Sequence, residues 1–361
     1  MHRDDVDYQL LDDLTRMREL DPSGMLAAIE ALPEQVRNAI SLAHEAEIPG
    51  LGSIRNVVVL GMGGSAIGGD LTRALYETES TVPIFVNRDY QIPGFVGPET
   101  LVIASSYSGN TEETLTAYEQ AKERGAQIVA LTTGGELARR AQAVGHPIIQ
   151  IPSGLSPRAA IGYSFYPLIV LLVRLGLISD QSDAFEESIA VLERQRERFG
   201  GVVPYSENEA KQLAVRLVDR FPLIYGGGGW KGVVAYRWKC QINENSKAVA
   251  VSNAFPELNH NETVGWEAPP SLTRLISVIN LRDKSDASYM QKRIDVTKEI
   301  MDGRVAEIID LWAEGSSPLA RMMSLIYPGD FVSLYLALLY KIDPTPVAMI
   351  DRLKKALAGA Q

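Results

Sequence analysis

Short apolar runs, each ending in a turn of small or polar residues, recur along this 361-residue chain. Such runs are typical of buried strands when the longer segments between them carry the periodicity of helices. In the first half they occupy residues 57–60, 84–86, 101–104, 128–131 and 148–151. Parallel strands need crossovers, and a parallel sheet is covered on both faces. The first half is therefore predicted to be a three-layer α/β/α subdomain with a mainly parallel five-stranded sheet.

The same plan restarts in the second half. The run 221–225 is followed by four glycines and Trp230, as residues 56–60 are followed by a glycine-rich turn. Further strands are predicted at 248–252, 275–281 and 306–310. We interpret this as an internal duplication, with a second α/β/α subdomain that also contains a mainly parallel five-stranded sheet. The expected order is an N-terminal helical segment at 1–50, the first subdomain at 51–160, a helical connector at 161–218, the second subdomain at 219–345 and a C-terminal helix at 346–361.

The main functional signal lies where the strand 101–104 ends and a helix begins. Residues 105–114 read SSYSGNTEET, so several hydroxyl groups gather at a helix N-terminus. Unpaired N–H groups and the positive end of the helix dipole bind anions, and small hydroxyl side chains add donors. Ser106, Ser108 and Thr111 are accordingly candidate phosphate ligands. N-capping without any ligand is the alternative, and this segment alone favours neither.

A second glycine-rich turn upstream favours the phosphate interpretation. Residues 61–70 read GMGGSAIGGD, and glycine lets the backbone approach a ligand closely. Gly63, Gly64 and Ser65 are the candidate contacts. A dinucleotide fingerprint is the alternative, but the acidic residue expected about twenty positions on is not placed after a second strand. The two loops together predict a monophosphate held by serines, and the second half lacks a comparable hydroxyl cluster.

Charge and hydropathy argue against two classes of partner. The formal net charge is −10 and the isoelectric point is about 5.1, whereas nucleic acids and anionic membranes favour basic surfaces. The first residues are too acidic for a secretory signal, and we find no run of eighteen or more apolar residues; 165–177 comes closest. We expect a soluble protein that acts without nucleic acid or membrane.

Cysteine and histidine usage restricts the compartment and the chemistry. The single cysteine, Cys240, excludes an internal disulfide and suits a reducing cytoplasm, where we place the protein. The spacings HxH and HExxH are absent, so no zinc ligand set is evident. The four histidines are His2, His44, His146 and His260.

Five longer motifs occur in order over most of the chain. They are GMGGSAIGGDL at 61–71, SSYSGNTEETL at 105–115, PRAAIGYSF at 157–165, NENSKA at 243–248 and PELNHNETVGW at 256–266. With them the chain resembles the bifunctional phosphoglucose/phosphomannose isomerase family, whose subdomains are of the sugar isomerase (SIS) type. The resemblance implies an aldose–ketose isomerase that interconverts glucose 6-phosphate and mannose 6-phosphate with fructose 6-phosphate through an enediol. It also implies a homodimer, a sugar phosphate as the bound partner, and no cofactor or metal ion.

The resemblance also assigns roles to individual residues. Glu244 would be the base that moves the proton, although Glu257 and Glu262 are competitors and a surface carboxylate is the default interpretation. We expect neighbouring amides to hold its carboxylate. His260 would open the sugar ring from the neighbouring subunit, and histidine titrates near neutrality. Arg158 would stabilise the enediolate with a permanently charged fork.

The C-terminal segment supplies the last candidate. Residues 346–357 form an amphipathic helical pattern, and the family has a lysine near its C-terminus that helps to open the ring. Lys354 is the best match, with Lys355 and Lys341 as competitors. Residues 181–210 have no assigned role.

Two alternatives to the dual isomerase stay open. One is an isomerase with a single specificity or another phosphosugar as substrate. The other is a regulator that senses a sugar phosphate, because SIS domains also serve as binding modules. The acidic charge, the lack of an evident helix-turn-helix region and the presence of both Glu244 and His260 argue against the regulator.

Overall fold

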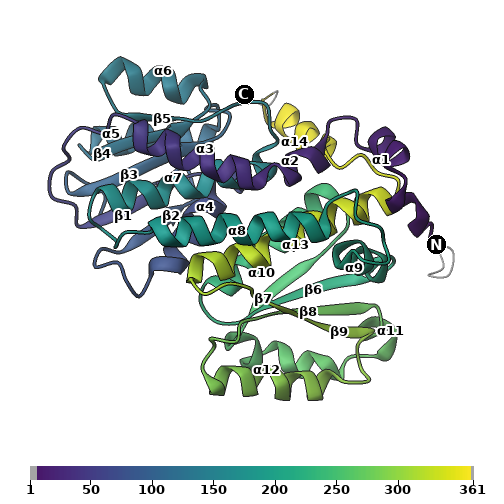
Figure 1. The fold of residues 1–361 in the computed structure, drawn as a ribbon. Helices are drawn as coiled ribbons and strands as arrows, with labels where there is room; N and C mark the ends of the chain where they lie inside the picture. The colour runs from purple at the N-terminus through teal and green to yellow at the C-terminus, as the bar shows by residue number, and fades with distance from the viewer. Residues whose placement is uncertain (1–5, 359–361) are drawn as a thin grey trace. The chain divides into compact units, whose positions relative to one another are not determined.

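The computed structural model describes residues 6–358, which divide into two compact units. Unit 1 contains residues 6–30, 194–313 and 325–358; unit 2 contains residues 31–193 and 314–324. Helices α8 (Ser182–Phe199) and α13 (Pro318–Leu339) contribute residues to both. Each unit has its own parallel sheet covered by helices, which confirms the predicted α/β class (Figure 1).

Unit 2 alternates strands and helices along the chain. Its other elements are α3 (Leu32–Glu45), β1 (Asn56–Leu60), α4 (Gly63–Tyr76), β2 (Ile84–Asn87), β3 (Thr100–Ser106), α5 (Glu112–Glu123), β4 (Gln127–Thr132), α6 (Gly135–Val144), β5 (Ile148–Gln150), η3 (Pro157–Ala159) and α7 (Ile161–Arg174). The five strands are all parallel, in the order β2-β1-β3-β4-β5. The five-stranded sheet predicted for this half is therefore confirmed.

The two faces of this sheet are covered by different helices. β-branched residues suit a strand buried on both sides, and three consecutive valines in β1 are fully buried. Side chains of α5 and α6 share a core with every second residue of β1, β3 and β4. On the opposite face α4 packs close to the sheet, because Gly69 has no Cβ to collide with Val59. Helix α7 packs on α3 and α4.

Unit 1 has a second sheet. Its elements, apart from the shared helices, are η2 (Tyr8–Asp12), α1 (Leu14–Leu20), α2 (Met25–Glu30), α9 (Glu209–Leu217), β6 (Phe221–Gly226), α10 (Trp230–Asn245), β7 (Val251–Ala254), η4 (Glu257–His260), η5 (Glu262–Glu267), α11 (Pro270–Thr273), β8 (Ile276–Arg282), α12 (Ser288–Met301), β9 (Glu307–Trp312) and α14 (Ala348–Ala358). The strands are parallel in the order β7-β6-β8-β9. Among the described residues this sheet has four strands, so the expectation of five was wrong here.

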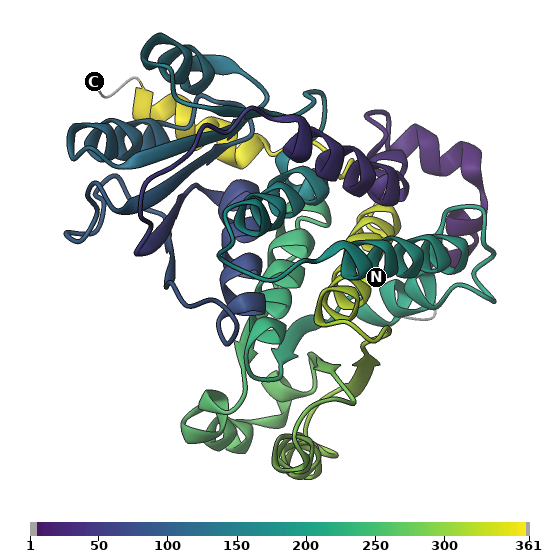
Figure 2. The same cartoon turned by 60° about the vertical axis from the view of Figure 1, so that its left-hand side comes forward.

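The second sheet is also covered on both faces. Residues of β6 and β8 form one core with α12 and with the segment that contains η4 and η5. Figure 2 shows α12 nearly along its axis. Helix α10 packs on β6 and β7, and it follows β6 through the glycines that the sequence pattern singled out.

The most apolar long helix is α13, and not the segment 165–177 that we expected to come closest to a membrane span. By length and composition α13 is sufficient to cross a membrane. However, 94% of its apolar window is buried inside the protein, as in the core helix of a soluble protein. It also contains a buried carboxylate, Asp330. Burial explains its apolar character without a membrane.

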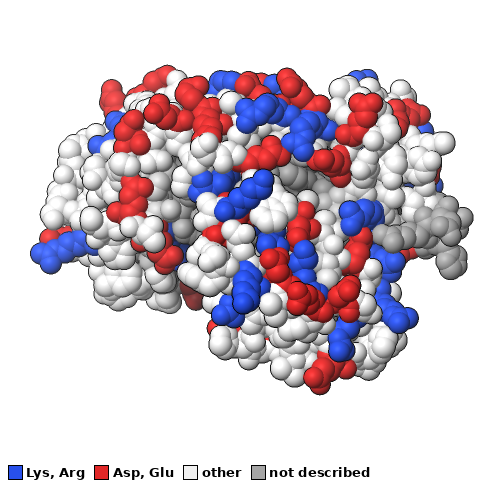
Figure 3. Space-filling view, turned by 60° about the horizontal axis from the view of Figure 1, so that its bottom comes forward, with Lys and Arg blue, Asp and Glu red and all other residues white. Residues whose placement is uncertain are grey.

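Charged side chains of both signs are interspersed on the face shown in Figure 3. Such a face lacks the basic stripe with which proteins bind nucleic acids. Among the described residues, opposite charges also form ion pairs, such as Arg139 with Glu136 at 2.6 Å and Arg55 with Glu99 at 3.0 Å.

Candidate active site

Two loops meet at the carboxyl edge of the first sheet. β1 and β3 are in register, with Leu60 beside Ala104, so the turns that follow them emerge at the same edge. The Ser65 hydroxyl in the first turn of α4 accepts a bond from the N–H of Tyr107, over 3.1 Å. The loop before α4 and the loop before α5 are thus joined. Both loops predicted to bind phosphate lie together.

The β3–α5 loop directs its hydroxyls in different ways. Ser106 is buried; its oxygen accepts the N–H of Gly109 at 3.1 Å and lies 2.9 Å from the Thr111 hydroxyl. Ser108 is exposed and accepts the N–H of Asn110 at 3.2 Å. Thr111 is the N-cap residue of α5, yet its side chain makes no capping bond. The N-capping alternative therefore does not describe Thr111, and its hydroxyl is paired with Ser106 instead.

Glycines bring backbone segments into contact around these loops. Gly109 has a φ of +70°, and a Cβ there would lie 1.8 Å from the carbonyl oxygen of Gly134. A Cβ on Gly64 would lie 2.7 Å from the carbonyl oxygen of Pro157 and 3.3 Å from the nitrogen of Arg158. The first turn of α4 thus touches the backbone that holds Arg158. The structure brings Arg158 together with the predicted phosphate loops.

Arg158 lies in η3, soon after β5 and at the same edge of the sheet, and is only 5% exposed. Tyr107 fixes the segment that leads to it. Its hydroxyl donates to the carbonyl of Pro152 at 3.0 Å and accepts the N–H of Leu155 at 3.0 Å. Burial raises the pKa of Tyr107, which keeps the phenol protonated and able to donate. Sequence reasoning missed this role, although an aromatic residue between two serines was the available signal.

A crevice lies where the order of the strands reverses in this sheet. β1 is flanked by β2 on one side and β3 on the other, and ligands of α/β sheets bind at such points. The side chain of Thr114 is 2% exposed, and its hydroxyl has no hydrogen-bond partner within residues 6–358. The crevice is lined by Leu60, Gly61, Met62, Asn87, Asp89, Glu113, Thr114 and Ala117. It borders the predicted phosphate loops.

Glu244 lies in the last turn of α10, in unit 1, and is half-buried. Polar residues spaced four positions apart lie along one face of α10, and their side chains form hydrogen bonds with α13. Arg237 donates to both carboxylate oxygens of Asp330 at 2.8 Å, and Gln241 donates to the same carboxylate at 2.6 Å. Asn245 donates to Ser333 at 3.0 Å. These bonds fix the helix end at which Glu244 lies.

The amide side chains beside Glu244 form hydrogen bonds with other parts of unit 1. Asn243 donates to the carbonyl of Ala248 at 2.9 Å, while Asn245 donates to α13. Lys247 has a φ of +54° and donates to the carbonyl of Pro344 at 2.9 Å. The described amide bonds therefore shape the turn after α10. That these amides also hold the Glu244 carboxylate stays a prediction.

His260 ends η4, between β7 and β8 of unit 1, and its side chain is exposed. Lys354 lies on α14 in the same unit and is exposed, as are its competitors Lys355 and Lys341. Exposure alone therefore does not distinguish one of these three lysines from the others. Arg158 and the phosphate loops belong to unit 2.

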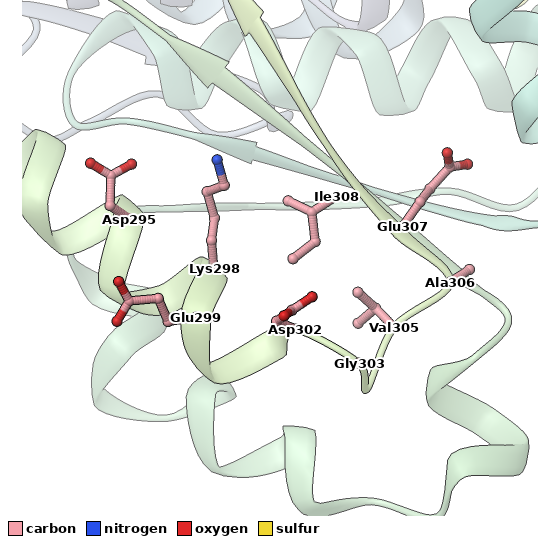
Figure 4. A pocket seen from close by; sticks show the side chains of 9 residues that line it. All are labelled: Asp295, Lys298, Glu299, Asp302, Gly303, Val305, Ala306, Glu307 and Ile308. Atoms are coloured by element: carbon pink, nitrogen blue, oxygen red, sulfur yellow. The ribbon is translucent and has the colours of Figure 1, made fainter.

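An acidic cavity of about 670 Å³ also opens in unit 1, beside α12 and the start of β9 (Figure 4). Its lining includes the carboxylates of Asp295, Glu299, Asp302 and Glu307, with Lys298 as the one cation. Such a lining repels an anionic sugar phosphate. None of the predicted site residues contributes to it. Within residues 6–358, no group of three or more His, Cys, Asp or Glu side chains is arranged to hold a metal ion.

Comparison with known proteins identifies the family. Residues 51–164 match the SIS domain, and residues 206–357 match the bacterial phospho-glucose isomerase C-terminal SIS domain. A bifunctional phosphoglucose/phosphomannose isomerase from Caldicellulosiruptor bescii is 50% identical over 335 residues, which cover 92% of this chain and 99% of the relative. The chain belongs to the bifunctional phosphoglucose/phosphomannose isomerase family. The family resemblance inferred from the motifs is confirmed.

A further member of the family agrees with this assignment, and a solved structure shares the fold. The enzyme of the same description from Thermoplasma volcanium is 38% identical and covers 85% of this chain and 93% of the relative. A glucose-6-phosphate isomerase-like protein from Thermus thermophilus aligns with a TM-score of 0.63 and 21% identity, over 93% of this chain and 97% of that protein. At that identity the structural likeness shows the fold alone.

The family motif PELNHNETVGW contains a residue whose role sequence reasoning missed. Glu262 was considered only as a competitor for the catalytic base. Its carboxylate accepts bonds from the Tyr225 hydroxyl and from the Asn253 amide, the latter at 2.5 Å. These donors lie on β6 and β7, far enough away in sequence that no local pattern reveals them. Glu262 is a structural acceptor, and this weakens its candidacy as base.

Proposed function

We propose that this chain is an aldose–ketose isomerase that interconverts glucose 6-phosphate and mannose 6-phosphate with fructose 6-phosphate. The observation that carries the proposal is the meeting of two hydroxyl-bearing loops at the sheet edge, beside the backbone of Arg158. The same activities are in the descriptions of relatives up to 50% identical to the chain. The reaction moves hydrogen within one molecule, so it consumes no external oxidant or reductant.

The first sheet supplies the phosphate site. The backbone at Gly63 and Gly64, the first turn of α5, and the hydroxyls of Ser108 and Thr111 donate to the phosphate oxygens. Ser65 and Ser106 are engaged in the loops, so they shape the site and reorient when the anion binds. The negative net charge of the chain makes these local donors necessary.

Isomerisation proceeds through an enediol. Glu244 removes the proton from carbon-2 of the open aldose, and the electrons of that bond form the carbon-1/carbon-2 double bond while the carbonyl oxygen becomes an enediolate. Arg158 stabilises that negative charge with its fixed, always-charged guanidinium. The proton of the carbon-2 hydroxyl moves to the carbon-1 oxygen and Glu244 returns its proton to carbon-1, so that carbon-2 becomes the carbonyl of the ketose. One base serves both epimers if the carbon-2/carbon-3 bond rotates after ring opening.

Ring opening needs a separate acid–base group. His260 transfers the proton between the ring oxygen and the anomeric hydroxyl, and Lys354 assists. The exposure of His260 suits its donation to the neighbouring subunit of a homodimer. One half-buried cysteine, Cys240, suits a reducing cytoplasm.

Proton NMR in heavy water tests this function. Chelator-treated protein is incubated with fructose 6-phosphate, and a matched sample contains the Glu244→Gln variant. Both glucose 6-phosphate and mannose 6-phosphate should appear with deuterium at carbon-2, while the variant should bind fructose 6-phosphate without turnover. A single product would reduce the proposal to one specificity. Binding without turnover by the unmutated protein would instead identify a sensor.

A further inference from the structure

The segment that contains His260 is anchored on both sides of that residue. It joins β7 to β8 through the short 3₁₀ turns η4 and η5 and the short helix α11. Leu258 and Trp266 are buried in the core below the sheet, while His260 is exposed. The ring therefore projects from a loop in which the residues on both sides of His260 are fixed. Side-chain hydrogen bonds fix these flanking residues.

The first anchor is the carboxylate of Glu262. Tyr225, which is fully buried in β6, donates its hydroxyl to one oxygen, and Asn253 of β7 donates its amide to the other at 2.5 Å. The N–H of Glu262 is capped by the Asn261 side chain at 2.6 Å. Burial, and then the hydrogen bond to Glu262 and its charge, raise the pKa of Tyr225, so its phenol stays protonated and remains a donor near neutral pH. Both carboxylate oxygens are thus held by rigid strands.

The second anchor is the side chain of Asn259. Its amide donates to Thr297 of α12 at 2.9 Å and to Thr263 at 3.1 Å. Thr297 is 2% exposed, so this bond is shielded from competing water. Position 260 consequently lies between one residue tied to a helix and one tied to two strands.

We propose that Glu262 is a positioning residue, which together with Asn259 holds the backbone so that the His260 imidazole has a fixed direction before substrate arrives. Preorganisation of a proton-transfer group removes an entropic cost from the step that it catalyses, whereas a loose loop would impose that cost at every turnover. The inference rests on the proposed function, in which His260 opens the sugar ring. In this proposal Glu262 affects the rate of ring opening, and it does not affect the rate of proton transfer by Glu244.

The test separates ring opening from isomerisation by the choice of substrate. The ring of fructose 6-phosphate closes when the carbon-5 hydroxyl adds to the carbon-2 carbonyl. 5-Deoxyfructose 6-phosphate lacks that hydroxyl, stays open, and needs no ring-opening step. Turnover of fructose 6-phosphate is compared with carbon-1 deuterium exchange of the open-chain probe in heavy water. The variants are Glu262→Gln and, as a matched control on the same segment, Glu267→Gln, which is exposed.

The expected result is selective. Glu262→Gln should lower kcat for fructose 6-phosphate by about ten- to a hundred-fold with little change in KM, and leave exchange of the open-chain probe unchanged. Glu267→Gln should match the wild type on both substrates. Equal losses on both substrates, or no loss on either, would overturn the positioning role.

Further measurements separate the positioning role from a folding defect and from a failure of the proposed function. Thr297→Val is nearly isosteric, removes the Asn259 acceptor, and should give the same selectivity with a smaller loss, about three- to ten-fold. The His260 imidazole resonance should be one sharp signal in the wild type and broadened in Glu262→Gln; an unchanged signal contradicts the proposal. His260→Ala separately tests the function, because it should spare the open-chain probe whatever Glu262→Gln does.

Discussion

Asn245 donates its side-chain amide to the Ser333 hydroxyl over 3.0 Å and thereby ties the last residue of α10 to α13. Ser333 also accepts, at its carbonyl, a bond of 2.6 Å from the hydroxyl of Ser246. Glu244 directly precedes Asn245 and Ser246 in the sequence. The proposed base is therefore placed by a polar contact between two residues that are 88 positions apart in sequence.

Replacing Ser333 should loosen that helix end. Ser333→Ala leaves the buried Asn245 amide without this acceptor, so we expect a loss of about 1–2 kcal/mol in the free energy of unfolding. We also expect kcat to fall by about three- to ten-fold, because a displaced base slows proton transfer more than it weakens substrate binding. Urea denaturation and steady-state turnover check this. Ser271→Ala, at an exposed position in α11, is the control; a stability loss with unchanged kcat would show that Glu244 does not depend on this contact.

Arg158 should not tolerate lysine. Arg158→Lys keeps the charge but loses the planar fork, in a site where the residue is only 5% exposed. We expect kcat to fall by about a hundred-fold with KM changed far less, because the lost interaction is strongest with the enediolate. Steady-state kinetics with fructose 6-phosphate provide the measurement. Arg124→Lys, on an exposed residue of the same unit, should behave as the wild type. A variant with wild-type kcat would remove Arg158 from the chemistry.

Gly109 and Gly125 form a matched pair for the phosphate loop. Both have left-handed φ values, +70° and +72°, so alanine costs about 1–2 kcal/mol at either position through backbone strain alone. Only at Gly109 would the new Cβ also meet a backbone oxygen, that of Gly134, at 1.8 Å. At Gly125 the nearest atom is a Pro98 side-chain carbon at 3.8 Å.

Gly109→Ala should therefore displace the β3–α5 loop. We expect it to weaken competition by inorganic phosphate by about ten-fold or more, beyond the strain that it shares with Gly125→Ala. Inhibition of turnover by phosphate and urea denaturation, measured on both variants, check this. Equal phosphate affinity in the two variants would mean that the loop does not bind the phosphate group.

The sequence predicts the first sheet well because its strands carry a local signal. The valines of β1 and the apolar run of β3 are buried on both faces, and a run of that kind needs no distant information. β7 was predicted at 248–252 but begins at Val251. The carbonyl of Ala248 is used by the turn after α10, which the left-handed Lys247 makes possible. Turn chemistry, rather than apolar character, sets where that strand begins.

The candidate site was accessible from sequence only where its residues form continuous motifs. Ser106, Thr111 and Gly109 are close in the chain, so their meeting follows from one loop. Arg237 and Asp330 are 93 positions apart, and neither stands out among the other charged residues. Long-range polar pairs of this kind depend on tertiary packing, and no local periodicity encodes them. The anchors of His260 escaped prediction for the same reason.

Glu187 of α8 predicts a specific acid sensitivity. Its carboxylate accepts the N–H groups of Ser316 at 2.6 Å and Ser317 at 2.7 Å, just before α13 begins at Pro318. Burial raises its pKa, but the bonds from Ser317 and Ser316 outweigh this and lower the pKa to about 2. Because the ordinary value is 4.5, the folded state binds this proton less readily than the unfolded state. The stabilisation is complete above pH 4.5 and is lost as the pH falls toward 2.

Glu187→Gln should therefore lower the free energy of unfolding by about 1 kcal/mol at pH 7, the usual value of a helix-capping interaction. The difference from the wild type should shrink below about pH 4.5, because the wild-type carboxylate then loses its advantage over the amide. Urea denaturation at about pH 7, 4 and 3 measures the difference, and Glu186→Gln, on the exposed neighbouring residue, should show no such trend. A difference that stays constant with pH would mean that the charge of Glu187 does not support the start of α13.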